Sequence, residues 1–172
     1  MFAFLKHSIV ATAVAVIAAS PVLAEDLPAP TGEILLTVAG DFPVKNQGDT
    51  AVFDAEMLKA IGEVSFQTST PWTEDEQTFT GVSLHRLMER LEITEGTLKA
   101  TAINDYAIDI PVSDAVEGGP ILAYLQNGEP MSVREKGPLW VVYPYDLKAE
   151  YQTEVTFSRS IWQLVRLDLV AN

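Results

Sequence analysis

Two stretches of this chain repeat apolar residues with the period of an α-helix. Residues 83–91 place four apolar side chains at positions i, i+3, i+4 and i+7, namely Leu84, Leu87, Met88 and Leu91. Ser83 stands directly before them, where a helix N-cap is expected. Residues 53–61 place a second apolar stripe behind Asp54, another candidate N-cap. The pattern therefore predicts one helix over each of these two stretches.

Much of the remaining chain has the β-branched, apolar and partly alternating composition of β-strands. The segments with this character are residues 33–39, 63–70, 97–103, 106–112, 121–126, 138–144 and 161–170. Asn127-Gly128 predicts a tight turn, because this pair accepts positive φ at both positions. Residues 71–81 contain the acidic run Glu74-Asp75-Glu76 and predict a loop. Few helices, many strands and no regular β-α-β alternation predict a single α+β domain that is mostly β.

The first 24 residues have the composition of a cleaved signal peptide. Lys6 and His7 form a short basic start, an apolar run of 11 residues follows, and Ser20-Pro21 ends it. Val22 and Ala24 supply the side chains at the two positions that signal peptidase recognises. A membrane anchor is disfavoured because a spanning helix needs about 18 or more apolar residues.

Cleavage after Ala24 would leave a mature chain of 148 residues. Residues 25–32 contain two prolines and no periodicity, and they predict an N-terminal linker before a domain over residues 33–172. We expect a periplasmic or secreted protein that makes no membrane contact after cleavage.

Charge and cysteine content exclude several classes of protein. The chain has 24 acidic and 11 basic residues and a formal net charge of −13, so its surface should repel the phosphate backbone of nucleic acids. The sequence contains no cysteine, which excludes disulfides, zinc-thiolate sites, iron–sulfur clusters and a thiol nucleophile. We therefore expect no nucleic acid among its partners.

Few side chains form a catalytic or metal-binding pattern. His85 lies four residues before Glu89, which is the spacing of an ordinary surface pair on a helix and also offers a candidate base or ligand. The Glu74-Asp75-Glu76 run lacks the spacing of a calcium loop and indicates a solvated segment. No G-x-S-x-G, G-x-G-x-x-G or Walker A sequence occurs. Three tryptophans either belong to the core or line a pocket, namely Trp72, Trp140 and Trp162.

Several short motifs resemble, in order, the molybdopterin-binding domain of the sulfite-oxidase fold. The matching segments are Asp105-Tyr106, Ile110-Pro111-Val112, Leu122-Ala123-Tyr124, residues 127–131, Gly137-Pro138-Leu139 and residues 141–144. Residues 79–84 resemble the start of a helix in that family. The resemblance rests on the order and spacing of these motifs over roughly residues 33–170. It implies a sulfite-oxidase-like fold with a cleft for a molybdopterin cofactor.

The residues that hold the cofactor in active members are replaced in this chain. The resemblance places the cysteine that binds molybdenum four residues before Trp72, at Thr68, and a hydroxyl is a far poorer ligand than a thiolate. The family's histidine before Gly-Pro is Lys136, which is either a solvated turn lysine or an anion contact. The arginine of the following strand is Trp140, and no phosphate loop is recognisable around residues 146–148. The fold is therefore expected without the metal chemistry.

Three hypotheses follow, and we favour the first because the thiolate and the anion contacts are missing together. The first is an exported, cofactor-free binding or accessory module, whose former cleft holds a small ligand or a segment of a periplasmic protein partner. The second is an oxidoreductase that still binds a molybdopterin-type cofactor, through backbone amides and without a cysteine. The third is an unrelated exported β-rich protein. The residues expected to line the former cleft are Thr68, Trp72, Asp105, Tyr106, Lys136 and Trp140.

Overall fold

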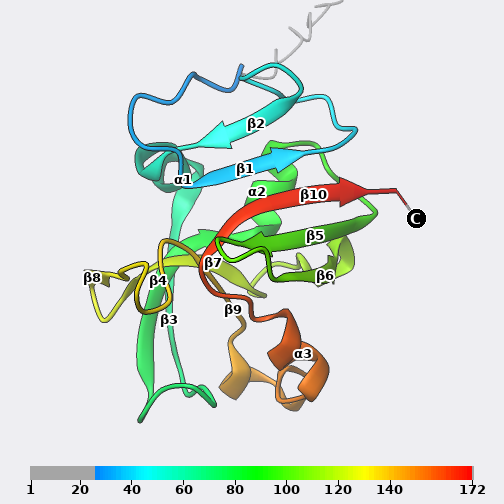
Figure 1. The fold of residues 1–172 in the computed structure, drawn as a ribbon. Coiled ribbons are helices and arrows are strands. Elements are labelled where there is room, and N and C mark those ends of the chain that lie inside the picture. The colour runs from blue at the N-terminus through cyan, green and yellow to red at the C-terminus, as the bar shows by residue number, and fades with distance from the viewer. Residues whose placement is uncertain (1–25, 172) are drawn as a thin grey trace, which may run out of the picture.

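The computed structural model describes residues 26–171, which form two β-sheets around one hydrophobic core (Figure 1). The core takes Leu36 and Leu167 from one sheet and Phe79 and Leu122 from the other, and none of these four side chains is exposed. The expected signal peptide over residues 1–24 lies outside the described residues. No helix of the described residues is long and apolar enough to cross a membrane.

The first sheet has five strands in the order β2-β1-β10-β5-β6. Their bounds are β1 (Leu36–Ala39), β2 (Thr50–Phe53), β5 (Thr97–Ala102), β6 (Ala107–Pro111) and β10 (Leu164–Val170). β1 and β10 are parallel, and the other neighbours in this sheet are antiparallel. The last strand of the described chain therefore lies in the centre of the first sheet.

The second sheet has the order β3-β4-β7-β8, and β9 also pairs with β7. Their bounds are β3 (Glu63–Thr68), β4 (Gln77–Ser83), β7 (Ile121–Gln126), β8 (Glu129–Pro130) and β9 (Trp140–Val142). Asn127 and Gly128 join β7 to β8 with φ of 53° and 82°, which confirms the predicted tight turn. β3 and β4 form a long hairpin that runs to the lower end of the molecule in Figure 1.

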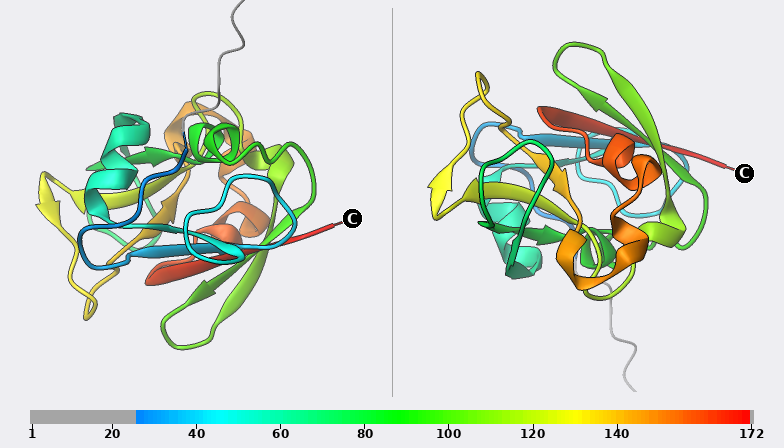
Figure 2. Two further views of the ribbon diagram at one scale, coloured as in Figure 1. Left: turned by 90° about the horizontal axis from the view of Figure 1, so that it is seen from above. Right: turned by 90° about the horizontal axis from the view of Figure 1, so that it is seen from below.

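Three α-helices complete the fold, α1 (Ala55–Gly62), α2 (Leu84–Arg90) and α3 (Glu154–Arg159). Short 3-10 turns cover Val112–Asp114, Tyr145–Leu147 and Ala149–Tyr151. α2 buries Leu84, Leu87 and Met88, as its apolar stripe predicts, although the Ser83 side chain makes no capping hydrogen bond. Seen from below, α3 and the two 3-10 turns before it lie nearest the viewer (Figure 2).

The structure corrects three of the expected elements. β4 begins inside residues 71–81, which were predicted as a loop, and its last five residues are buried, so no polar alternation marks it. Gly81 adds to this, because a side chain there would collide with the backbone of Leu122 in β7. Phe53 ends β2 and does not start a helix. α3 was missed because Thr156 is its only buried residue, which leaves no apolar stripe.

Asp54 joins the N-terminal segment to α1. Its Oδ1 accepts a hydrogen bond from the Met57 amide at 2.9 Å, which confirms the predicted N-cap. Its Oδ2 accepts from the amides of Thr31 at 2.8 Å and Gly32 at 2.9 Å. Residues 26–32 thus contain no helix or strand, yet they are anchored here and through the buried side chain of Leu27. The backbone hydrogen bonds, that of Met57 first, hold the pKa of Asp54 below its ordinary value.

We expect Asp54→Asn to lower the free energy of unfolding by about 2 kcal/mol at neutral pH, because an amide nitrogen replaces one acceptor among three donors. A lowered pKa stabilises the fold above the unfolded value of 3.8, and this contribution disappears as pH falls through the lower folded value. Urea unfolding should therefore show the difference between wild type and variant shrinking as the pH falls below about 4.

Asp109→Asn, at an exposed carboxylate in β6, is the matched control. It should leave the free energy of unfolding and its pH dependence unchanged. A difference for Asp54→Asn that stays constant across this pH range would contradict the role assigned to the carboxylate.

Candidate functional site

Trp72 is the centre of a cluster of aromatic rings below the sheets. It lies in the loop between β3 and β4, and its ring is packed edge to face against four others. The centroid distances are 5.9 Å to Trp140, 6.3 Å to Tyr145, 5.8 Å to Phe157 and 5.7 Å to Trp162. The cluster therefore joins the β3–β4 loop to β9 and to the segment that leads into β10.

The open side of this cluster forms a pocket of about 370 Å³. It is lined by Trp72, Asn104, Tyr106, Phe157, Ser158, Ser160, Ile161 and Trp162. Four of these eight residues are aromatic and none carries a charge. Such a lining is typical of small-molecule sites, which are mostly apolar with a few placed polar groups.

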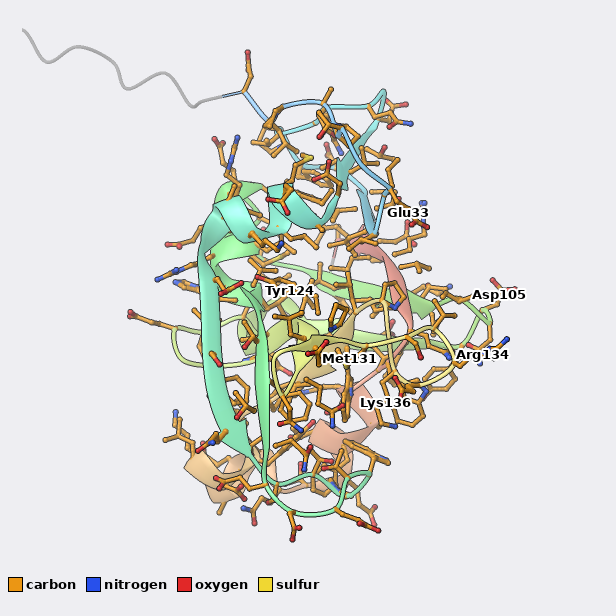
Figure 3. All side chains as sticks on the ribbon, turned by 90° about the vertical axis from the view of Figure 1, so that its left-hand side faces the viewer. Glu33, Asp105, Tyr124, Met131, Arg134 and Lys136 are labelled. Carbon is orange, nitrogen blue, oxygen red and sulfur yellow. The ribbon has the colours of Figure 1, made fainter. Side chains whose placement is uncertain are left out.

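The turn between β5 and β6 contributes one wall of the pocket. Tyr106 is 53% exposed and faces the pocket, and its amide donates to Asn104 Oδ1 at 3.2 Å. Asp105 adopts a left-handed conformation with φ of 64° at the tip of the turn and stays exposed outside the lining. Figure 3 shows Asp105 on the same side of the molecule as Arg134 and Lys136.

Gln163 connects this turn to the loop before β9. Its carbonyl accepts from the Ile103 amide at 3.0 Å, and its own amide donates to Lys136 O at 3.0 Å. Its side chain donates to Val133 O at 2.6 Å. These bonds fix Trp162, the preceding residue, between the two loops.

Lys136 packs on the aromatic cluster. Its Nζ lies 4.2 Å from the centroid of Trp162 and 5.0 Å from that of Trp140. Burial of the half-exposed side chain lowers the pKa of Lys136, because desolvation disfavours the charged form. No carboxylate among residues 26–171 forms a salt bridge with it. The lysine is therefore neither a freely solvated turn residue nor part of an ion pair.

Thr68 lies apart from the pocket, at the end of β3. Its side chain is fully buried, and its hydroxyl lies 3.2 Å from Asp146 Oδ2 and accepts from the Asp146 amide at 3.2 Å. Ser69 donates to the same carboxylate through its amide at 2.5 Å and its hydroxyl at 2.7 Å. These hydrogen bonds, that of the Ser69 amide first, hold the pKa of Asp146 below its ordinary value. A carboxylate therefore stays ionised beside Thr68 at neutral pH.

The six expected cleft residues divide into four groups in the structure. Trp72 and Tyr106 line the pocket, whereas Trp140 and Lys136 border it through the rings of Trp72 and Trp162. Asp105 is exposed at the rim, and Thr68 belongs to the separate Asp146 network. The sequence did not indicate the pocket residues Asn104, Phe157 and Ser158.

His85, the candidate base or ligand of the sequence, pairs with Glu89 on α2. His85 Nε2 lies 3.5 Å from Glu89 Oε1, which confirms the expected i, i+4 pair, and Nδ1 lies 3.0 Å from Ala115 O. Within residues 26–171, no group of three or more histidine and acidic side chains has the geometry to hold a metal ion.

Comparison with protein-family models gives a match over residues 53–150 to the oxidoreductase molybdopterin binding domain. This segment is more than half of the chain. The chain belongs to the molybdopterin-binding-domain family. The hypothesis of an unrelated β-rich protein is therefore wrong, and the predicted family resemblance is confirmed.

Solved structures support the same fold. One similar structure is the sulfane dehydrogenase SoxCD from Paracoccus pantotrophus, with a TM-score of 0.58 and 15% sequence identity. The match covers 80% of this chain and 38% of the SoxCD chain, so this domain spans well under half of that protein. At this identity the likeness concerns the fold alone, and it confirms the predicted mostly-β, sulfite-oxidase-like architecture. No curated protein sequence matches the chain significantly.

The residues around Thr68 do not fit a molybdenum ligand site. Thiolate sulfur is the family's expected donor, and this member has a buried hydroxyl that is already bonded to Asp146. The ionised Asp146 carboxylate would also repel an anionic cofactor at this position. The family membership thus supplies the fold, while this donor set does not supply the metal site.

We expect Thr68→Val to lower the free energy of unfolding by about 1–2 kcal/mol, because the Asp146 amide loses its acceptor and the carboxylate loses one partner. Thr68→Ser keeps the hydroxyl and is the matched control. Urea unfolding of both variants measures the effect. Equal stability of Thr68→Val and wild type would show that the hydroxyl does not support this loop.

Proposed function

We propose that this member of the family is an exported binding or accessory module that has kept the fold and binds no molybdenum cofactor. The observation that carries the proposal is Thr68, a fully buried hydroxyl bonded to Asp146 where the family resemblance expects a thiolate. The 172-residue sequence has no cysteine that could replace it. The net charge of −13 also opposes the retention of an anionic cofactor.

The aromatic pocket supports a binding role for the module. It contains no charged side chain, and the hydroxyls of its two serines already donate to backbone carbonyls, so neither serine is prepared as a nucleophile. It does offer ring surface and a few polar atoms, which suit a small ligand or a segment of a periplasmic protein partner.

The family itself favours a second function, an oxidoreductase that binds a molybdopterin-type cofactor without a cysteine. In that case backbone amides of the cleft would have to hold the phosphate and the metal would need another anchor. Cofactor content separates the two functions.

We expect protein exported by its native host in molybdate-supplemented medium to contain no stoichiometric molybdenum by elemental analysis and no pterin by fluorescence after oxidation. The same protein should unfold cooperatively on heating, because its core is complete without a cofactor. Stoichiometric molybdenum in the purified protein would overturn the proposal. A protein that is unfolded when isolated, and that folds only after a molybdenum cofactor is added, would also overturn it.

Thr68→Cys is the companion variant. The new thiol would face Asp146 in a buried site, so we expect no sulfite or sulfoxide turnover and no bound molybdenum. Turnover by this variant would show that the remaining cofactor contacts are intact.

Export is tested at the N-terminus. We expect the protein from the periplasmic or secreted fraction to begin at Glu25, because the segment before it has the signal-peptide pattern. Intact-mass measurement of the fractionated protein reads this directly. A full-length mass from the cytoplasmic fraction would contradict it.

A further inference from the structure

The aromatic pocket has a wall arrangement suited to a flat molecule. The rings of Phe157 and Trp162 stand at 85° and 70° to the ring of Trp72, with centroids 5.8 Å and 5.7 Å away. Tyr106 adds a fourth ring from the β5–β6 turn. Walls at steep angles to one another offer a planar ligand both a ring face to stack on and ring edges to contact.

The polar atoms of the pocket are mostly engaged already. Ser160 Oγ donates to Thr156 O at 2.8 Å and accepts from the Tyr145 hydroxyl at 2.7 Å. Ser158 Oγ donates to Val155 O at 2.7 Å. The side-chain nitrogen of Asn104, Nδ2, has no hydrogen-bond partner within residues 26–171. A ligand with many hydroxyls would leave most of them unpaired, whereas one acceptor placed near Asn104 would be satisfied.

The charges around the pocket disfavour ions of either sign. Lys136 Nζ stands 4.2 Å from the Trp162 centroid, so a second cation against this ring would meet a like charge. An anion would be attracted by Lys136 at the border of the pocket, but the lining itself has no charged group to pair with it, and the net charge of −13 of the whole chain repels it. An uncharged ligand avoids both penalties.

We propose that this pocket binds an uncharged aromatic or heteroaromatic molecule of one or two rings that carries a hydrogen-bond acceptor. The inference rests on the proposed function of the chain as a binding module. The volume of about 370 Å³ accommodates a ligand of this size. The rings stack between Trp72, Tyr106 and Trp162, and the acceptor faces the Asn104 amide.

Three bicyclic probes of matched shape test the charge requirement. They are uncharged quinolin-2-one, cationic N-methylquinolinium and anionic quinoline-2-carboxylate. The three indole N–H signals of the ¹⁵N-labelled protein report the position of binding, because the sequence has three tryptophans and only Trp72 and Trp162 line the pocket. We expect quinolin-2-one to shift the signals of these two residues in a saturable manner, and to bind at least about tenfold more tightly than either ion.

Substitutions test whether the probe binds in this pocket and whether Lys136 is the charge that repels the cation. Tyr106→Ala should weaken quinolin-2-one binding by about tenfold, since a stacked ring is lost. Ile103→Ala is the matched control, because Ile103 is 46% exposed on the same turn and lies outside the lining. Lys136→Met should strengthen binding of the cation relative to that of quinolin-2-one, since the like charge is removed.

Each remaining outcome overturns the inference. Tighter binding of either ion than of quinolin-2-one would show that the ligand is charged. Equal effects of Tyr106→Ala and Ile103→Ala, or no saturable shift of the two indole signals up to about 5 mM probe, would remove the pocket as a site for this class. These binding experiments do not depend on the molybdenum content of the protein. The measurement of cofactor content therefore tests the binding-module function separately.

Discussion

β10 pairs with β1 on one side and with β5 on the other, so the first sheet is complete only when the end of the described chain is in place. The residues just before β10 also cross to the second sheet. Val141 donates to Ile161 O at 2.9 Å, and Leu164 donates to Leu139 O at 2.9 Å. One continuous segment therefore belongs to both sheets, and its side chains between these bonds, Trp162 above all, are positioned by the whole fold.

The aromatic cluster follows from this crossing. Trp72 arrives from a loop of the second sheet, and Trp162 arrives from the segment that enters the first. Trp140 lies fully buried between them, and its indole N–H donates to Ser160 O at 3.0 Å. The same contacts that stabilise the junction of the sheets thus shape the pocket.

The residues expected to line one cleft lie in two regions of the structure, one around Thr68 and one around the aromatic rings. At Thr68, the buried hydroxyl and Asp146 are hydrogen-bonded to one another. At the rings, apolar surface remains open to solvent, with Trp162 37% exposed and Tyr106 53% exposed. Family membership establishes the fold, whereas function depends on the residues at the site.

The sequence alone determined the elements whose signals are local. The stripe of α2, the cap of α1 by Asp54 and the Asn127-Gly128 turn each depend on residues within a few positions of one another. Motif order indicated the family, and the sequence contains no cysteine that could serve as the family's expected metal ligand.

Only the tertiary structure decided the remaining features, because they depend on partners far apart in the chain. β4 is buried on both faces by other elements, so it showed no alternation. Asp146 meets Thr68 across 78 positions, and no sequence pattern connects them. Of the six residues expected in one cleft, Thr68 and Asp105 lie outside the pocket, while Phe157 from the unpredicted α3 forms one of its walls. Local patterns determine where strands and helices form, whereas long-range packing determines which of their side chains share a site.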